Sequence, residues 1–197
     1  MKILIATKNE GKIAELRSLL SDERHEFIGL DALSDIPDVE ETGNTFAENA
    51  KLKAAAYSTH FGLHTLADDS GLEVQALNGR PGVFSARYGG VKKNYDAKIR
   101  LLLEQLDEAE NKDRRARFVS HIAFASPNGD VLFEAEGVCE GSIAFKPKGT
   151  NGFGYDPVFI PAGFDQTFGE LSDQVKQKTS HRARAIAKIM RYLRDFA

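Results

Sequence analysis

The chain has 197 residues, a length that suits one domain, or two lobes that share one core. It contains one cysteine, Cys139, which excludes an internal disulfide, and its longest stretch without charged side chains, residues 118–129, is shorter than the roughly 18 residues of a membrane helix. Its 26 Lys and Arg against 29 Asp and Glu give a formal charge of −3, which argues against a broad basic face for nucleic acid.

The start of the chain predicts a strand followed by a helix. Residues 2–6 form a short apolar run typical of a buried strand, and apolar side chains then recur at helical spacing. Lys2 is followed by only five uncharged residues before Lys8, which does not resemble a signal peptide. Together with the single cysteine, this predicts a cytoplasmic protein.

A second strand is predicted over residues 27–30, and an acidic loop with a proline follows over residues 31–44. Thr45 and Glu48 have the spacing of a capping box, so we expect a helix to begin there and to run through the alanine-rich segment that follows. A short strand over residues 65–67 comes next.

The second half of the chain predicts another helix, a hairpin and a final helix. Asn94 can cap a helix whose leucines and isoleucine recur at helical spacing. Strands over residues 118–125 and 131–145 flank the turn Pro127-Asn128-Gly129, which indicates a hairpin, and another strand is expected over residues 157–160. The last helix is expected to begin near Thr179 or Ser180. These elements favour a mixed α/β sheet with helices packed on it.

The polar turn after the first strand suits an anion. Free N–H groups and the dipole at a helix start favour phosphate, Gly11 permits a close approach, and Lys12 adds a positive charge. The turn lacks the Walker pattern. Taken alone, such a turn is more often a plain helix cap than a phosphate site.

Paired carboxylates follow the strand predicted over residues 65–67. Asp68 and Asp69 repel each other unless a cation or hydrogen bonds offset the repulsion, and Mg²⁺ commonly combines one or two carboxylates with substrate phosphates. Because successive strand side chains point to opposite faces, one of the pair faces the site and the other supports it, with Asp69 the better ligand. Glu40 and Glu41 could supply a further ligand. The alternatives are an Asx turn and a solvated acidic loop.

Two later segments suit a nucleotide. Residues 149–156 place Phe153 and Tyr155 among three glycines, and either ring offers a face on which a base could stack, unless both lie in the core. His181 and Arg182 stand in the first turn of the last helix, where cations oppose the helix dipole unless an anion lies nearby. The alternative for them is the solvated face of an amphipathic helix.

Taken together, seven motifs in this order resemble the non-canonical purine nucleoside triphosphate pyrophosphatases, the inosine triphosphate pyrophosphatase family. Each motif alone is weak, but their order over nearly the whole chain makes the resemblance specific and outweighs the alternatives above. The motifs are Thr7-Lys8-Asn9-Glu10-Gly11-Lys12, Glu40-Glu41-Thr42-Gly43, Glu48-Asn49-Ala50 with Lys53, Ala67-Asp68-Asp69-Ser70-Gly71, Pro81-Gly82 with Ser85-Ala86-Arg87-Tyr88, Gly152-Phe153-Gly154-Tyr155-Asp156-Pro157, and Ser180-His181-Arg182.

The resemblance implies an α/β fold over residues 1–197, in which a long mixed β-sheet and flanking helices form two lobes around a central substrate cleft. It also implies Mg²⁺-dependent hydrolysis of inosine, deoxyinosine and xanthosine triphosphates (ITP, dITP and XTP) to the monophosphate and pyrophosphate, with ATP spared. Such an activity cleanses the nucleotide pool of deaminated purines. A homodimer is implied as well, whereas composition predicts no nucleic-acid or membrane partner.

Roles carry over to the positions that match the family's motifs. Asp69 is then the proton acceptor and a metal ligand, with Asp68 and Lys12 beside it and Glu40 or Glu41 as a further ligand, Glu40 being favoured. The residues implied to hold the phosphate chain are Thr7, Lys8, Asn9, Glu10, Gly11, Lys12, Lys53 and Lys176. Those implied around the sugar and base are Ser70, Phe153, Gly154, Tyr155, Asp156, His181 and Arg182.

Base choice has a simple hydrogen-bonding explanation. A 6-keto purine presents an acceptor where adenine presents an amino donor, so donors from Arg182, His181 or the backbone would meet adenine donor to donor. Lys178 and Thr179 replace the family's usual asparagine and aliphatic residue, which bears only on fine substrate preference.

Two other functions remain open. One is a related nucleotide pyrophosphatase of the septum-inhibitor type that acts on pyrimidine or modified nucleotides. The other is a non-catalytic nucleotide or nucleic-acid binding protein. The aromatic and Ser-His-Arg motifs count against the first, and the retained carboxylate pair counts against the second, because binding alone would not require it.

Overall fold

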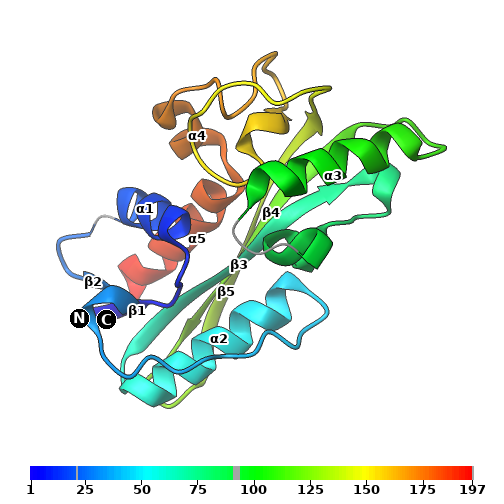
Figure 1. The fold of residues 1–197 in the computed structure, drawn as a ribbon. Coiled ribbons are helices and arrows are strands. Elements are labelled where there is room, and N and C mark those ends of the chain that lie inside the picture. Colours follow the sequence, from blue (N-terminus) through cyan, green and yellow to red (C-terminus); the bar gives the residue numbers. More distant parts are fainter. Residues whose placement is uncertain (21, 91–93, 197) are drawn as a thin grey trace. The chain divides into compact units, whose positions relative to one another are not determined.

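The computed structural model describes residues 1–20, 22–90 and 94–196 and has a mixed α/β fold, as the sequence predicts (Figure 1). Six strands form one sheet in the order β2-β1-β3-β4-β5-β6, in which β1 runs parallel to β2 and β3, whereas β6 is antiparallel to β5. The strands are β1 (Lys2–Ile5), β2 (Glu26–Gly29), β3 (His64–Val74), β4 (Arg115–Ala125), β5 (Val131–Ile143) and β6 (Phe159–Pro161). The α-helices are α1 (Glu10–Leu19), α2 (Phe46–Phe61), α3 (Tyr95–Glu108), α4 (Asp173–Thr179) and α5 (His181–Asp195).

One compact unit consists of Met1–Asp69, Ser120–Gly137 and His181–Ala197. Side chains of β1 alternate between two apolar clusters, as expected for a strand that is covered on both faces. Ile3 and Ile5 join the cluster that includes residues of α1 and α5, whereas Leu4 joins the cluster that includes residues of α2. Helices α1 and α5 pack against each other in this unit (Figure 1).

The other compact unit consists of Ser70–Val119 and Val138–Ser180. Its core combines β3 and β6 with the apolar stripe of α3, in which Ile99, Leu102 and Leu106 are buried as their spacing predicts. The Asn94 side chain accepts a hydrogen bond from the Ala97 N–H and so caps the helix start.

Local sequence signals determine where the longest helix and the hairpin begin and end. Thr45 accepts from the Glu48 N–H while the Glu48 carboxylate accepts from the Thr45 N–H, so the predicted capping box opens α2. Gly62 ends that helix in a left-handed conformation. Between β4 and β5 the Gly129 N–H bonds to the Ser126 carbonyl, at the predicted turn.

Several predicted elements differ from the structure. The strands expected over residues 118–125 and 131–145 are β4, which begins at Arg115, and β5, which ends at Ile143. The strand expected over residues 65–67 is part of β3, which continues to Val74, so Asp68 and Asp69 lie inside a strand and not in an Asx turn. The strand expected over residues 157–160 begins later, at β6, because a 3₁₀ turn occupies Asp156–Val158 first. The segment predicted as a loop up to residue 90 contains 3₁₀ turns within Gly82–Gly90, interrupted at residues 87–89, whose dihedral angles are not helical.

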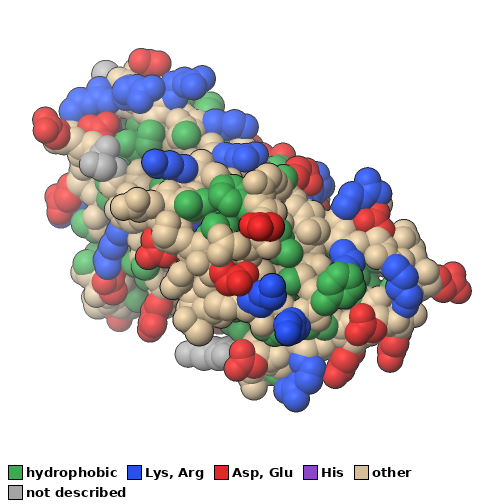
Figure 2. Space-filling view, turned by 90° about the horizontal axis from the view of Figure 1, so that it is seen from above, with side chains coloured by type: hydrophobic (Ala, Val, Ile, Leu, Met, Phe, Trp, Pro, Cys, Tyr) green, Lys and Arg blue, Asp and Glu red, His purple; other side chains and the backbone are tan. Residues whose placement is uncertain are grey.

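Charged side chains of both signs are interspersed over the face seen in Figure 2, in keeping with the near-neutral net charge. Among the helices of the described residues, none combines the length and the apolar character needed to cross a membrane.

Candidate active site

Asp68 is the centre of a buried ion-pair network. It is 1% exposed and lies on β3, where one carboxylate oxygen is 2.8 Å from the Lys12 ammonium and 3.4 Å from the Arg182 guanidinium. The other oxygen accepts a 2.5 Å hydrogen bond from the Ser120 hydroxyl. Burial alone would raise the pKa of Asp68, but the charges of Arg182 and Lys12 hold that pKa well below its usual range. Asp68 therefore stays ionised.

Glu15 completes this network and was not predicted from the sequence. Its carboxylate pairs with the guanidinium of Arg182, which is only 1% exposed, so Arg182 lies between two acidic side chains, Glu15 and Asp68. Lys12 and Glu15 are three residues apart on α1 and share a helix face, which is the sequence signal that could have identified Glu15.

Asp69 faces a different set of partners, as expected for neighbours on a strand. One of its oxygens lies 2.9 Å from the Lys53 ammonium, and the other accepts a 3.3 Å hydrogen bond from the Asn49 amide. Burial raises the pKa of Asp69, and the nearby Lys53 and Lys12 charges only partly oppose this effect. A carboxylate whose affinity for protons is raised in this way suits a proton acceptor.

Lys53 links Asp69 to the acidic loop. The same ammonium lies 2.5 Å from the Glu41 carboxylate, so α2 holds both carboxylates together through one cation. Burial lowers the pKa of Lys53, but the charges of Asp69 and Glu41 outweigh burial and raise it overall. Glu40 is exposed. Of the two candidate glutamates, the structure thus brings Glu41 to Asp69.

The donor set around Asp69 suits a hard cation. Mg²⁺ is usually bound through one or two protein carboxylates plus substrate phosphates, and Asp69 and Glu41 offer two carboxylates that already share a cation. Over residues 1–20, 22–90 and 94–196, no group of three or more His, Cys, Asp and Glu side chains is arranged to hold a metal ion by itself. A cation bound by these two carboxylates would complete its coordination with water and phosphate oxygens.

The predicted phosphate turn opens α1. The Asn9 side chain accepts from the Lys12 N–H and the Thr7 hydroxyl accepts from the Asn9 N–H, so the turn is held by its own polar side chains. Lys8 lies at the surface, 3.2 Å from the Asp38 carboxylate, whereas the Lys12 ammonium is directed to Asp68. The turn thus presents the start of a helix beside the Asp68 network.

The start of α5 places Arg182 in the same network, with His181 next to it in the chain. Both side chains are buried, which excludes the solvated helix face as their setting. Gly137 of β5 makes this placement possible, because a Cβ there would lie 2.1 Å from the His181 carbonyl oxygen and 2.5 Å from the Ala185 nitrogen. The absence of a side chain lets the helix start pack directly on the strand.

The second compact unit contains the aromatic segment of the predicted site. Tyr155 is buried, and its hydroxyl donates to the Ser85 carbonyl, so its ring belongs to the core and is not a free stacking face.

Phe153 is half-buried, and the Lys176 ammonium lies 4.8 Å from its ring centroid. Lys176 also pairs with Asp156, whose carboxylate accepts from the Phe153 N–H. Ser70 lies on β3, next to Asp69 in sequence.

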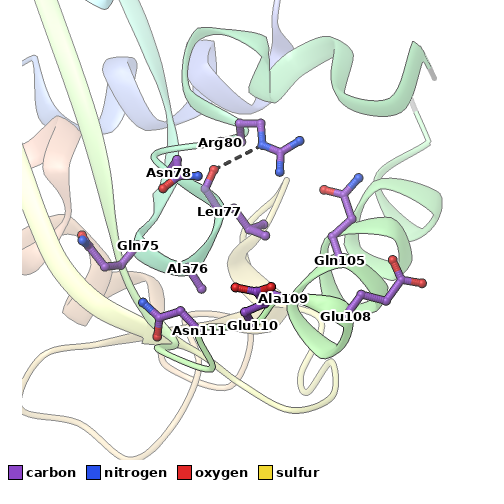
Figure 3. A pocket seen from close by; sticks show the side chains of 10 residues that line it. All are labelled: Gln75, Ala76, Leu77, Asn78, Arg80, Gln105, Glu108, Ala109, Glu110 and Asn111. Atoms are coloured by element: carbon purple, nitrogen blue, oxygen red, sulfur yellow. Dashed lines mark hydrogen bonds between the residues drawn. The ribbon is translucent and has the colours of Figure 1, made fainter.

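A polar pocket of about 540 Å³ lies elsewhere in this second unit (Figure 3). It is formed by the turn after β3 and by the end of α3, and the Arg80 side chain at its rim donates to the Leu77 carbonyl at 3.2 Å. None of the residues predicted to bind substrate or metal lines it. The pocket is therefore not a candidate for the reaction.

Comparison with known proteins gives a consistent result. A family model described as the Ham1 family matches residues 3–192. The chain is 46% identical over 193 residues to a protein of Oceanobacillus iheyensis named dITP/XTP pyrophosphatase, with 98% of each chain covered. It is also 46% identical over 196 residues to a Streptomyces avermitilis protein of the same name, again with 98% of each covered. Among solved structures, a HAM1 protein from Coxiella burnetii matches with a TM-score of 0.90 and 42% identity, covering 99% of each chain.

Proposed function

The chain belongs to the Ham1 family, and on that basis we propose that it hydrolyses the non-canonical purine nucleoside triphosphates dITP, XTP and ITP to the monophosphate and pyrophosphate. Relatives named dITP/XTP pyrophosphatases are 44–47% identical to it over nearly the full length of both chains. The chain is accordingly a nucleoside triphosphate pyrophosphohydrolase that removes deaminated purines from the nucleotide pool.

The observation that carries this proposal is the buried carboxylate pair with separate cationic partners. Asp68 is neutralised by Lys12 and Arg182, whereas Asp69 is shared between Lys53 and a neutral amide. Asp68 is thereby committed to holding the site together. The Asp69 oxygen that faces Asn49 accepts a hydrogen bond from a neutral amide, and that oxygen is suited to accept a proton or to bind a metal.

In the proposed reaction, a water oxygen attacks the α-phosphorus and the bond from that phosphorus to its bridging oxygen breaks. Asp69 accepts the proton of the water, and pyrophosphate leaves with the bridging oxygen. Little covalent chemistry is required of the protein beyond positioning and charge neutralisation. The Thr7 to Lys12 turn, Lys53 and Lys176 would hold the phosphate chain.

We propose Mg²⁺ as the cofactor, held by Asp69 together with Glu40 or Glu41. When bound, it would neutralise charge on the phosphate oxygens. The contact of Glu41 with Lys53 supports Glu41. The position of Glu40, three residues before Gly43, favours Glu40.

The base is proposed to meet donors from His181 and from the backbone of the Ser180-His181-Arg182 turn, since the Arg182 guanidinium itself pairs with Glu15 and Asp68. The Phe153 ring is proposed as a face on which a base could stack. A 6-keto purine satisfies such donors, whereas adenine leaves them unpaired, which is an effective means of discrimination. The single domain with two lobes, the homodimer and the cytoplasmic location stay predictions that rest on the resemblance and the composition.

Isotope labelling tests the position of bond cleavage. With Mg²⁺ and dITP in H₂¹⁸O, we expect one ¹⁸O atom in deoxyinosine monophosphate and none in pyrophosphate, detected by mass spectrometry. Label in pyrophosphate would place the attack at the β-phosphorus. Orthophosphate as the first product would contradict the proposed function.

A further inference from the structure

Asn49 is a fully buried side chain that joins two parts of the proposed site. Its Nδ2 amide donates to Asp69 at 3.3 Å, and its Oδ1 accepts from the Gly43 N–H at 2.8 Å. Gly43 closes the acidic loop that carries Glu40 and Glu41. One side chain of α2 therefore connects the proposed proton acceptor with the loop that holds the second proposed metal ligand.

Lys53 makes the same connection one helical turn later. Residues four apart on a helix lie on one face, and Asn49 and Lys53 accordingly reach the two different oxygens of Asp69. Lys53 also reaches the acidic loop, through Glu41. The two residues form a two-point link between β3 and the loop, but only Lys53 places a charge on Asp69.

The space around Gly43 shows how closely the loop is held. A Cβ on Gly43 would lie 2.7 Å from the Asn49 Oδ1 and 2.6 Å from the Glu48 Cβ. The neighbouring Asn44 N–H donates to Glu48 at 2.6 Å, which ties the end of the loop to the first turn of α2. Glycine at position 43 thus permits the close approach that the Asn49 hydrogen bond requires.

We propose that Asn49 is a positioning residue that sets the separation between Asp69 and the Glu40-Glu41 loop, and so the affinity of the site for its divalent cation. This inference rests on the proposed function. An amide suits the position because it donates to Asp69 and accepts from Gly43, whereas a carboxylate could not donate and would repel Asp69. Hydrogen bonds that orient metal ligands typically change metal affinity by about 10- to 100-fold.

The test measures Mn²⁺ binding by electron paramagnetic resonance in the presence of α,β-methylene-dITP, an analogue that resists cleavage of the relevant bond. Asn49→Leu keeps the branching of the side chain, with a larger volume, and removes both hydrogen bonds. We expect its Mn²⁺ dissociation constant to rise by about 10-fold or more, with the KM for dITP nearly unchanged at saturating Mg²⁺. Gly43→Ala introduces a methyl group on the loop side of the hydrogen bond between Gly43 and Asn49. It should also raise the Mn²⁺ dissociation constant.

Ser58→Ala is the matched control, because Ser58 is another fully buried polar side chain of α2 and its hydroxyl donates to the Ala55 carbonyl. It should leave Mn²⁺ affinity unchanged. If Asn49→Leu folds and binds Mn²⁺ as tightly as the unsubstituted protein does, the inference is overturned. If Asn49→Leu does not fold, an unchanged Mn²⁺ affinity of Gly43→Ala overturns it instead. If the natural protein itself neither binds Mn²⁺ nor cleaves dITP, the proposed function fails as well.

Discussion

Replacing Asp69 with Asn is expected to lower kcat on dITP by roughly 10²- to 10⁴-fold, the range typical for loss of a general base, while the protein stays folded. The substitution keeps the shape of the side chain but removes its ability to accept a proton and weakens it as a metal ligand. Burial already raises the pKa of Asp69, so proton affinity at this position is a property that the fold creates. Lys53 retains Glu41 as a partner, which preserves local structure.

Steady-state kinetics and thermal unfolding of Asp69→Asn check this prediction together. The matched control is Asp31→Asn, because Asp31 is an exposed carboxylate of the same unit that pairs with Arg17 at 2.9 Å. Its kcat should equal that of the natural protein. Near-normal turnover in Asp69→Asn would remove Asp69 from the proposed role.

Replacing Asp68 with Asn is expected to reduce the free energy of unfolding by about 3–5 kcal/mol at pH 7, the cost of breaking a buried ion pair. The change removes the carboxylate that pairs with the Lys12 and Arg182 cations, although Glu15 still contacts Arg182. Urea unfolding measures this difference. The exposed Asp31→Asn control should cost no more than about 1 kcal/mol.

The pH dependence of the Asp68 effect gives an independent check. Because Arg182 and Lys12 hold the folded-state pKa of Asp68 well below its unfolded value of about 3.9, the stability from this group is complete above that value. That stability is lost as the pH falls toward the folded-state pKa. The difference between the natural protein and Asp68→Asn should therefore shrink in acid, and a constant difference would contradict the network.

Elements determined by local sequence could be predicted. The capping box at Thr45 and Glu48 and the cap at Asn94 each determine a helix start through groups within one turn, so pattern and position agree with the structure. The course of β3 could not be predicted in the same way. Its polar centre, Asp68 and Asp69, resembles a turn in sequence, but in the structure it is strand, and side chains distant in the chain neutralise the two carboxylates.

The partners of Asp68 could not be predicted from the sequence motifs. Ser120 is 52 residues away in the chain and Arg182 is 114 residues away, and neither contact has a local signal. The motifs identified Arg182 as a group for the base, whereas the structure places its guanidinium between Glu15 and Asp68. The same applies to Tyr155, which the motif identified as a group for the base. The structure buries its ring next to Tyr95 and Ser85, and this burial depends on packing that the composition does not specify.

A nucleotide panel tests the central claim most directly. The values of kcat/KM for pyrophosphate release from dITP, XTP, ITP, GTP and ATP should be measured with saturating Mg²⁺ under identical conditions. We predict values for dITP, XTP and ITP that exceed that for ATP by at least about 10²-fold, as expected when hydrogen-bond donors reject the amino group of adenine. Lower values are predicted for GTP as well, although guanine shares the 6-keto group and the donor argument does not apply to it. Equal values for all five nucleotides would contradict the proposed function, and so would a preference for ATP.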